Sequence, residues 1–271
     1  MNVKIFKRRA MRPLRVVQIT DCHLGSQPGE LMLGLDTDQS LFDVLELIQN
    51  SEPTPDLILA TGDISNDGGA ASYQRFIDIV NHYFPGVALA WLPGNHDDPL
   101  NMDQVDILPI EAHYRAQGWN LILLDSRIPM EEGGELHPNE LMRLDAELKA
   151  NSEPTMVFLH HQPVPVGSEW IDQYVVKNAE AFFDVLDKYD HVKAVSWGHV
   201  HQEFQDSRNN VTLLATPSTC VQFAPKSKPF KLDTIMPGYR SYSLNADGSF
   251  TSEVKRIQTK AYAIDFASTG Y

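Results

Sequence analysis

RVVQITDCH at residues 15–23 joins a short apolar run to an acidic side chain and an imidazole, those of Asp21 and His23. Nearly continuous apolar runs of this length are typical of strands that are buried on both faces. Further runs of this kind predict strands at residues 57–60, 87–92, 121–124, 156–159 and 192–195. The stretch at 15–23 is therefore the first of several predicted strands that end in polar, chemically active residues.

Amphipathic helices are predicted between these strands. Apolar residues at positions i, i+3, i+4 and i+7 occur within 41–48 and 73–80, and a similar stripe occurs at 141–148. Strand and helix therefore alternate, which indicates an α/β fold. Beyond residue 203 the polar turns at 207–210 and 245–248 indicate hairpins, so we expect an antiparallel sheet added to the α/β body.

Composition and charge exclude several classes of protein. The 271 residues are 42% hydrophobic and 21% charged, which is typical of a soluble globular protein. The 36 Asp and Glu residues against 22 Lys and Arg residues give a net charge of −14, and the one dense basic run is residues 4–15, so we expect no nucleic-acid partner. The sequence has no bilayer-spanning run, no apolar core of a secretory signal, and two cysteines, Cys22 and Cys220. We therefore expect a cytoplasmic protein without a membrane partner.

Five of the six predicted strands are followed by side chains that can bind a metal. In open α/β sheets, ligands bind beyond the carboxyl ends of the strands. Carboxylate and imidazole groups together favour a transition metal such as Zn, Fe, Mn, Ni or Cu. The five blocks are Asp21-Cys22-His23, Gly62-Asp63, Gly94-Asn95-His96-Asp97, His160-His161-Gln162-Pro163 and Gly198-His199-Val200-His201.

The spacing within the first and last blocks indicates which side chains can reach a common site. On an extended segment, residues i and i+2 project to the same side. We therefore expect Asp21 with His23, and His199 with His201, to face the site, while Cys22 points away.

Each block alone also has a purely structural interpretation. Asp21 could cap a helix, Asp63 could stabilise a turn, and a single buried histidine could be a hydrogen-bonded core residue. Five strand ends that carry such groups in order would be an improbable accident. The joint pattern therefore favours a metal site.

The five blocks resemble the signature of the calcineurin-like metallophosphoesterases, and the match covers residues 15–203. The further runs at 91–97, 170–173 and 214–223 look like those of the bacterial class III 3′,5′-cyclic-AMP phosphodiesterases. This resemblance implies a four-layer α/β sandwich of two mixed β-sheets flanked by helices, with a C-terminal antiparallel strand extension. It also implies one domain over 1–271, divided into a basic tail at 1–13, a five-motif catalytic core at 14–203, and a β extension and substrate wall at 204–271.

The resemblance implies a role for each matched residue. One metal ion would be held by Asp21, His23 and His201, the other by Asn95, His160 and His199, with Asp63 bridging both. Of the adjacent histidines, His160 stands in the position of the family ligand, and His161 does not. His96 would be catalytic, and the substrate would contact His23, Asp63, Asn95, His96, His160 and His201. The cofactors would be two divalent or mixed-valence ions of Fe, Mn or Zn with a bridging hydroxide, and the sequence does not choose among these metals.

The activity implied by the resemblance is hydrolysis of 3′,5′-cyclic AMP to 5′-AMP, with His96 protonating the departing 3′-oxygen. Two alternatives stay open: another phosphodiesterase or phosphomonoesterase of the superfamily, and a non-catalytic interaction module. The substrate class, including cyclic AMP against cyclic GMP, depends on the substrate wall, for which Trp170 and residues 216–223 are candidates. No Gly-x-Ser-x-Gly or Walker loop is present, which argues against other hydrolase mechanisms. We expect a monomer or a homodimer.

Overall fold

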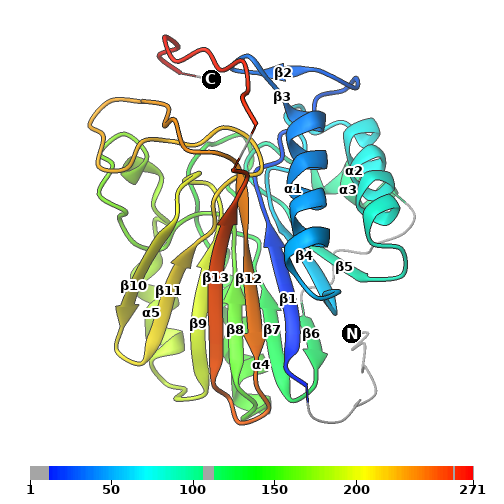
Figure 1. The fold of residues 1–271 in the computed structure, drawn as a ribbon. Coiled ribbons are helices and arrows are strands. Elements are labelled where there is room, and N and C mark those ends of the chain that lie inside the picture. The colour runs from blue at the N-terminus through cyan, green and yellow to red at the C-terminus, as the bar shows by residue number, and fades with distance from the viewer. Residues whose placement is uncertain (1–11, 106–112, 259, 271) are drawn as a thin grey trace.

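Two large mixed β-sheets form the centre of the molecule (Figure 1). The computed structural model describes residues 12–105, 113–258 and 260–270, so most of the predicted basic tail at 1–13 lies outside the described residues. The first sheet has the strand order β13-β12-β1-β4-β5, in which β1, β4 and β5 are parallel and β12 and β13 are antiparallel to their neighbours. Its strands are β1 (Leu14–Ile19), β4 (Leu57–Thr61), β5 (Ala88–Leu92), β12 (Gly238–Leu244) and β13 (Phe250–Arg256).

The second sheet has the order β10-β11-β9-β8-β7-β6, with a parallel centre formed by β11, β9, β8 and β7. Its strands are β6 (His113–Ala116), β7 (Trp119–Leu123), β8 (Thr155–Phe158), β9 (Val192–Trp197), β10 (Phe204–Arg208) and β11 (Val211–Ala215). A small hairpin of β2 (Leu31–Met32) and β3 (Leu35–Asp36) lies before the first helix.

The helices cover the outer faces of the two sheets. The apolar stripe of α1 (Thr37–Ser51) and that of α2 (Ala70–Tyr83) pack with β1, β4 and β5 in one core, and α4 (Pro138–Ala150) and α5 (Ala179–Leu186) pack with β8 and β9 in another. A third core lies between the sheets. The short elements α3 (Pro99–Gln104) and η1 (Asp172–Tyr174) lie in loops between the larger elements. The four layers are therefore helix, sheet, sheet and helix.

The predicted α/β class and its strands and helices are confirmed. The turns at 207–210 and 245–248 join antiparallel neighbours, as predicted. The C-terminal strands do not form a separate added sheet, however: β12 lies beside β1 in the first sheet, and β11 runs parallel to β9 in the second. They complete the two sheets. The C-terminal third of the chain therefore lies beside β1 and β9, the strands that precede the first and fifth blocks.

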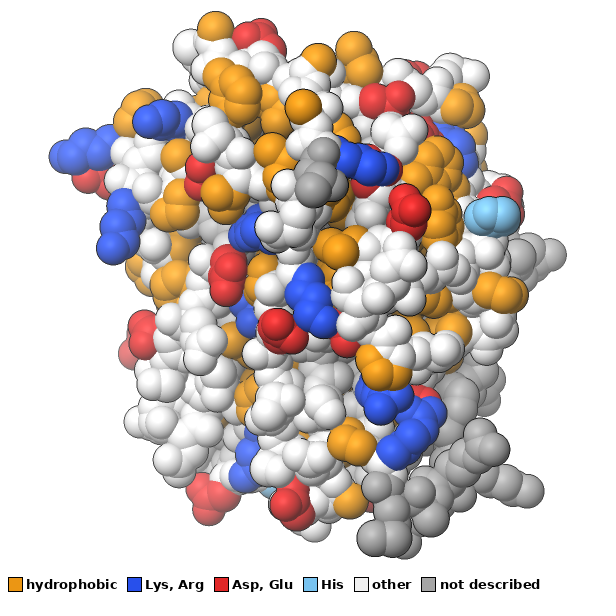
Figure 2. All heavy atoms as spheres, viewed as in Figure 1, with side chains coloured by type: hydrophobic (Ala, Val, Ile, Leu, Met, Phe, Trp, Pro, Cys, Tyr) orange, Lys and Arg blue, Asp and Glu red, His pale blue; other side chains and the backbone are white. Residues whose placement is uncertain are grey.

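Two surface properties follow from the structure. Within the described ranges, no helix combines the length and apolar character needed to cross a bilayer. Figure 2 shows one face of the molecule, on which Lys and Arg side chains are interspersed with Asp and Glu.

Candidate metal centre and substrate pocket

The five sequence blocks meet where the two sheets present the carboxyl ends of their parallel strands. Blocks one to three follow β1, β4 and β5 of the first sheet, and blocks four and five follow β8 and β9 of the second. The predicted aspartate and histidine ligands come together there as buried, metal-competent groups, with the partly buried Asn95 and His96 at their edge. Crevices at the carboxyl ends of parallel strands are the usual place for ligands in such sheets.

One group of donors contains Asp21, His23 and His201. The Nε2 atom of His201 lies 3.3 Å from Asp21 Oδ1 and 3.3 Å from His23 Nε2. His201 Nδ1 donates to the Val221 carbonyl oxygen at 2.8 Å, which turns Nε2 toward the other two side chains. The ligand atoms of the group all lie within 4.8 Å of one another, close enough to hold one cation.

A second group contains Asp63, Asn95 and His160. His160 Nδ1 donates to the Thr61 carbonyl oxygen at 2.8 Å, while Nε2 faces Asn95 Oδ1 at 3.1 Å and Asp63 Oδ2 at 3.3 Å. Burial lowers the pKa of His160, but the charges of Asp63 and Asp21 and the hydrogen bonds of the ring outweigh it and raise the pKa to about 9. Without a bound metal, the protonated His160 ring therefore places a positive charge and an Nε2–H group next to these two oxygens.

Asp63 lies between the two groups. Its Oδ2 atom is 3.3 Å from His160 Nε2 and 3.8 Å from His23 Nε2, and its Oδ1 atom accepts the His96 backbone N–H at 2.9 Å. Burial raises the pKa of Asp63, yet the surrounding histidines, His160 foremost, hold it well below its usual range. An ionised carboxylate at the centre of several imidazoles is a chemically suitable bridge between two cations.

His199 provides the clearest test of whether a metal fits. Its side chain is buried, and neither ring nitrogen has a hydrogen-bond partner among the described residues. Burial, together with the neighbouring His161 and His160, holds its pKa far below the usual value, so the ring is neutral. Leaving a buried polar atom without a partner costs about 1–3 kcal/mol. A metal bound to this imidazole would remove part of that cost, so the residues present fit the group.

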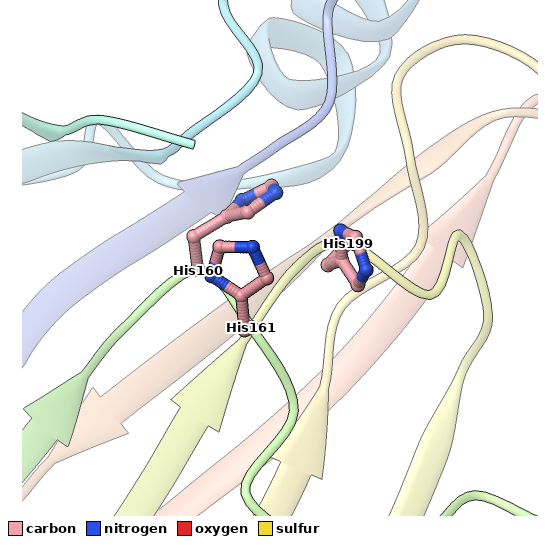
Figure 3. Close-up of side chains that lie close together, drawn as sticks. All are labelled: His160, His161 and His199. Atoms are coloured by element: carbon pink, nitrogen blue, oxygen red, sulfur yellow. The ribbon is translucent and has the colours of Figure 1, made fainter. Parts of the chain in front are cut away.

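His161 is adjacent to this cluster but differs from His160 in its bonding. Figure 3 shows the rings of His160, His161 and His199 gathered together, and their nitrogens are close enough to form a geometric ligand group. Both nitrogens of His161 are already engaged, however: Nδ1 is 2.8 Å from Ser126 Oγ, and Nε2 is 3.2 Å from the Glu132 carbonyl oxygen. His160 therefore has the better available nitrogen, in line with the choice made from the sequence.

The backbone around these residues is left-handed, which corrects one sequence-based argument. Asp21 and His23 have φ values of 54° and 48°, and His199 and His201 have 62° and 47°. The paired residues thus lie in tight turns beyond the strands and not on extended segments. Their side chains still converge, and the intervening Cys22 packs into the core beneath α1 and α2.

Glycines precede the ligands because the backbone segments approach closely. Gly62 has a φ of 94°, and a Cβ atom there would lie under 3.0 Å from His160 Nδ1.

Asp97 connects the turn after β4 to the turn after β5. Its carboxylate accepts backbone N–H groups from Gly94 at 2.8 Å and Ser65 at 3.0 Å. Asp98 accepts the Leu100 N–H and caps α3. Asp97 thus joins two of the loops that carry the proposed ligands, and Asp98 stabilises the start of α3.

A pocket of about 360 Å³ opens beside the cluster, and His96 lies in its wall. The His96 ring meets that of His23 edge-on at 5.0 Å, and its Nδ1 is 3.4 Å from the Asn66 carbonyl oxygen. The lining residues are Asn95, His96, Met130, Glu131, Glu132, Trp170, Ile171, Tyr174, His199, Phe230, Thr269 and Gly270. Another hollow, of about 330 Å³, lies around Arg15, Glu52 and Tyr242 and contains none of the predicted ligands.

The structure places only part of the predicted substrate wall at this pocket. Trp170 lines the pocket, but residues 216–223 do not. That segment is buried beneath the first donor group, where Ser218 Oγ donates to the Asp21 carbonyl oxygen at 2.8 Å and the Phe223 ring stacks on His201 at 4.1 Å. It supports the proposed ligands and does not line the pocket. Phe230 and the stretch 269–270, which sequence reasoning missed, form part of the wall instead.

Comparison with known proteins agrees with this fold. The chain belongs to the calcineurin-like phosphoesterase family, whose model matches residues 14–203. It is 41% identical over 264 residues to the 3′,5′-cyclic adenosine monophosphate phosphodiesterase CpdA of Vibrio vulnificus and 42% identical over 264 residues to the protein of that name from Escherichia coli K12; each match covers 95% of both chains. The fold is also similar to that of a dimetal phosphatase from Danio rerio, with a TM-score of 0.60 and 16% identity, over 86% of this chain and 95% of that one. The predicted family is confirmed.

Proposed function

We propose that this chain hydrolyses 3′,5′-cyclic AMP to 5′-AMP at a centre of two divalent or mixed-valence transition-metal ions. The observation that carries this proposal is the pair of convergent donor groups, with Asp63 close to a histidine of each, beside a pocket lined by His96. The phosphodiesterase names of relatives with 41% and 42% identity support the choice of substrate. We further propose that the enzyme acts in the cytoplasm, as a monomer or homodimer.

Each ion has a proposed set of ligands. Asp21, His23 and His201 would hold one ion; Asn95, His160 and His199 would hold the other; and Asp63 would contact both. When bound, such ions lower the pKa of a water molecule and neutralise charge on a phosphoryl group. This donor set of imidazole, carboxylate and amide suits Fe, Mn or Zn.

His96 is the proposed general acid. Its backbone N–H is fixed by Asp63 Oδ1 at 2.9 Å, and its Nδ1 lies near the Asn66 carbonyl oxygen, which favours a proton on Nδ1. A second proton on Nε2 could then pass to the departing 3′-oxygen of the ribose. The same imidazolium would stabilise negative charge on the phosphoryl oxygens. His96 is partly exposed in the pocket wall, where a substrate can reach it.

The charge and shape of the site suit a nucleotide monoanion. The chain has a net charge of −14, but two divalent ions would bring four positive charges against the two carboxylates of Asp21 and Asp63. Part of the pocket wall is aromatic: Trp170 and Phe230 meet edge to face with ring centroids 5.0 Å apart. An adenine ring placed there would bury apolar surface while the phosphate meets the ions and the side chains of His23, Asp63, Asn95, His96, His160 and His201.

A substrate panel tests this proposal directly. The metal-loaded chain would be assayed on cyclic AMP, cyclic GMP, bis(4-nitrophenyl) phosphate and 5′-AMP, with the metal content of the same sample measured. We expect about two ions per chain and the largest kcat/KM on cyclic AMP. Higher kcat/KM on 5′-AMP would identify a phosphomonoesterase, and a chain without stoichiometric metal or activity would indicate an interaction module.

A further inference from the structure

One side of the pocket is acidic. Glu131 and Glu132 both line it, and no Lys or Arg is found among its described lining residues. This placement is unexpected for a site that takes anions. Since both carboxylates are exposed to solvent, their effect depends on what each one contacts.

The two glutamates differ in how their charge is balanced. Glu131 Oε2 pairs with Lys177 Nζ at 2.6 Å, so its charge is largely compensated. Over the described part of the chain, Glu132 has no ion pair with a basic side chain. Its carboxylate accepts a hydrogen bond from the Tyr174 hydroxyl, which raises the pKa of that tyrosine. Glu132 therefore brings an uncompensated negative charge to the pocket.

Glu132 is also held in place relative to the proposed metal ligands. Its carbonyl oxygen is 3.2 Å from His161 Nε2, and the loop that carries it is closed by a bridge between Arg127 and Gly134. Its partner Tyr174 meets the His199 ring edge-on at 6.1 Å. The Glu132 carboxylate thus lies in the pocket wall, bonded to a tyrosine that contacts a proposed metal ligand.

We propose that Glu132 is a specificity-determining residue that disfavours dianionic phosphomonoesters relative to monoanionic phosphodiesters. This inference rests on the proposed function. Hydrolysis forms one P–O bond to water and breaks the P–O3′ bond; one proton goes to the 3′-oxygen, and the other is released as the product ionises. The substrate carries one negative charge, and the product carries nearly two above the second pKa of about 6 of a phosphate monoester. The same carboxylate therefore repels 5′-AMP more strongly than cyclic AMP, which assists product release.

The expected size of the effect follows from Coulomb's law. For an exposed carboxylate several ångströms from the phosphate, one additional charge changes the affinity by roughly two- to fivefold. Salt screens charges at this distance, with a Debye length of about 8 Å at physiological ionic strength. The discrimination should therefore decrease in high salt.

The test compares two ligands that differ in charge and little else, 5′-AMP and adenosine 5′-methylphosphonate. Their Ki values would be measured against cyclic AMP hydrolysis by the metal-loaded wild-type, Glu132→Gln and Glu135→Gln enzymes. The side-chain amide oxygen that Glu132→Gln introduces can still accept the Tyr174 hydrogen bond. Glu135 is exposed and outside the pocket lining, so Glu135→Gln is a control with the same change in net charge.

We expect Glu132→Gln to tighten 5′-AMP binding roughly two- to fivefold more than methylphosphonate binding, with no such difference in Glu135→Gln. Equal changes for both ligands would show that Glu132 only positions Tyr174 and would overturn the inference. The same selective change in Glu135→Gln would overturn it too, because net charge would then be the cause. If the wild-type enzyme does not hydrolyse cyclic AMP, the proposed function fails, which is a separate result.

Discussion

The adjacent histidines His160 and His161 give the sharpest test of the proposed metal centre, because they share burial and differ in bonding. In His160→Ala the protein loses the nitrogen that faces Asn95 Oδ1 and Asp63 Oδ2 at 3.1 Å and 3.3 Å. We expect the metal content to fall from about two ions per chain toward one. Removing a residue that hydrogen-bonds to a metal ligand typically lowers activity 10- to 100-fold. Loss of His160, a proposed ligand itself, should lower activity by more than that.

His161→Ala should have the opposite profile. It removes the contacts of the ring with Ser126 Oγ at 2.8 Å and the Glu132 carbonyl oxygen at 3.2 Å. Two hydrogen bonds at about 1 kcal/mol each, with the lost packing of a buried ring, predict a loss of about 2–4 kcal/mol in the free energy of unfolding. That corresponds to a Tm lower by roughly 5–15 °C for a chain of this size. Both metal ions should remain.

Metal analysis by mass spectrometry and thermal unfolding of the same preparations would compare the two variants. Both changes remove one imidazole, so the comparison needs no correction for side-chain size. The reasoning would be refuted if His161→Ala lost one ion while His160→Ala kept both, since the ligand would then be His161.

Three further substitutions test other parts of the site. Asp63→Ala should reduce the metal content below two and abolish most activity, because Asp63 is proposed to contact both ions; two retained ions with normal turnover would contradict the bridging role. His96→Ala should keep both ions and lower kcat on cyclic AMP by roughly 10²–10⁴, but much less on bis(4-nitrophenyl) phosphate, whose phenolate leaves without a proton; equal losses on both would argue against a general acid. Gly62→Ala should displace His160 and lower metal content, because the Cβ would lie under 3.0 Å from the ring and φ is 94°; metal content equal to that of the wild type would mean that the turn can relax.

The sequence was sufficient to predict the fold class and which side chains converge at the candidate site. Apolar runs such as 57–61 form buried strands, and the residues that follow them meet because the carboxyl ends of parallel strands share one edge of a sheet. The stripe of 41–48 likewise predicted the buried face of α1. These features depend on local periodicity, which a single sequence displays directly.

The pocket wall could not be predicted in the same way. Residues 216–223 mix polar side chains with apolar ones and a single phenylalanine, a composition that suits either a wall or a core. Only the tertiary contacts place them beneath His201. Phe230, Glu132 and the stretch 269–270 come from loops that lack periodicity and are far apart in the sequence. The hydrogen bonds that distinguish His160 from His161 are likewise tertiary, since their partners at Thr61 and Ser126 are distant in the chain.

The conformation of the ligand turns indicates how the protein prepares a site for metal. Asp21, His23, Asp63, His199 and His201 all have φ between 47° and 62°, and a left-handed residue other than glycine costs roughly 1–2 kcal/mol. The five together cost about 5–10 kcal/mol, comparable to the net stability of a typical domain.

Hydrogen bonds between the turns offset this cost. The backbone N–H groups of Asp21 and His23 donate to the carbonyl oxygens of Gly62 and Asp63 at 3.0 Å and 2.9 Å, and the His199 N–H lies 3.1 Å from both Asp21 carboxylate oxygens. The turn after β1 thus bonds both to the turn after β4 in the same sheet and to the turn after β9 in the other sheet. Because the chain itself makes these bonds, the donor atoms converge before any ion binds. The free energy that offsets the left-handed backbone therefore comes from contacts within the protein and not from metal binding.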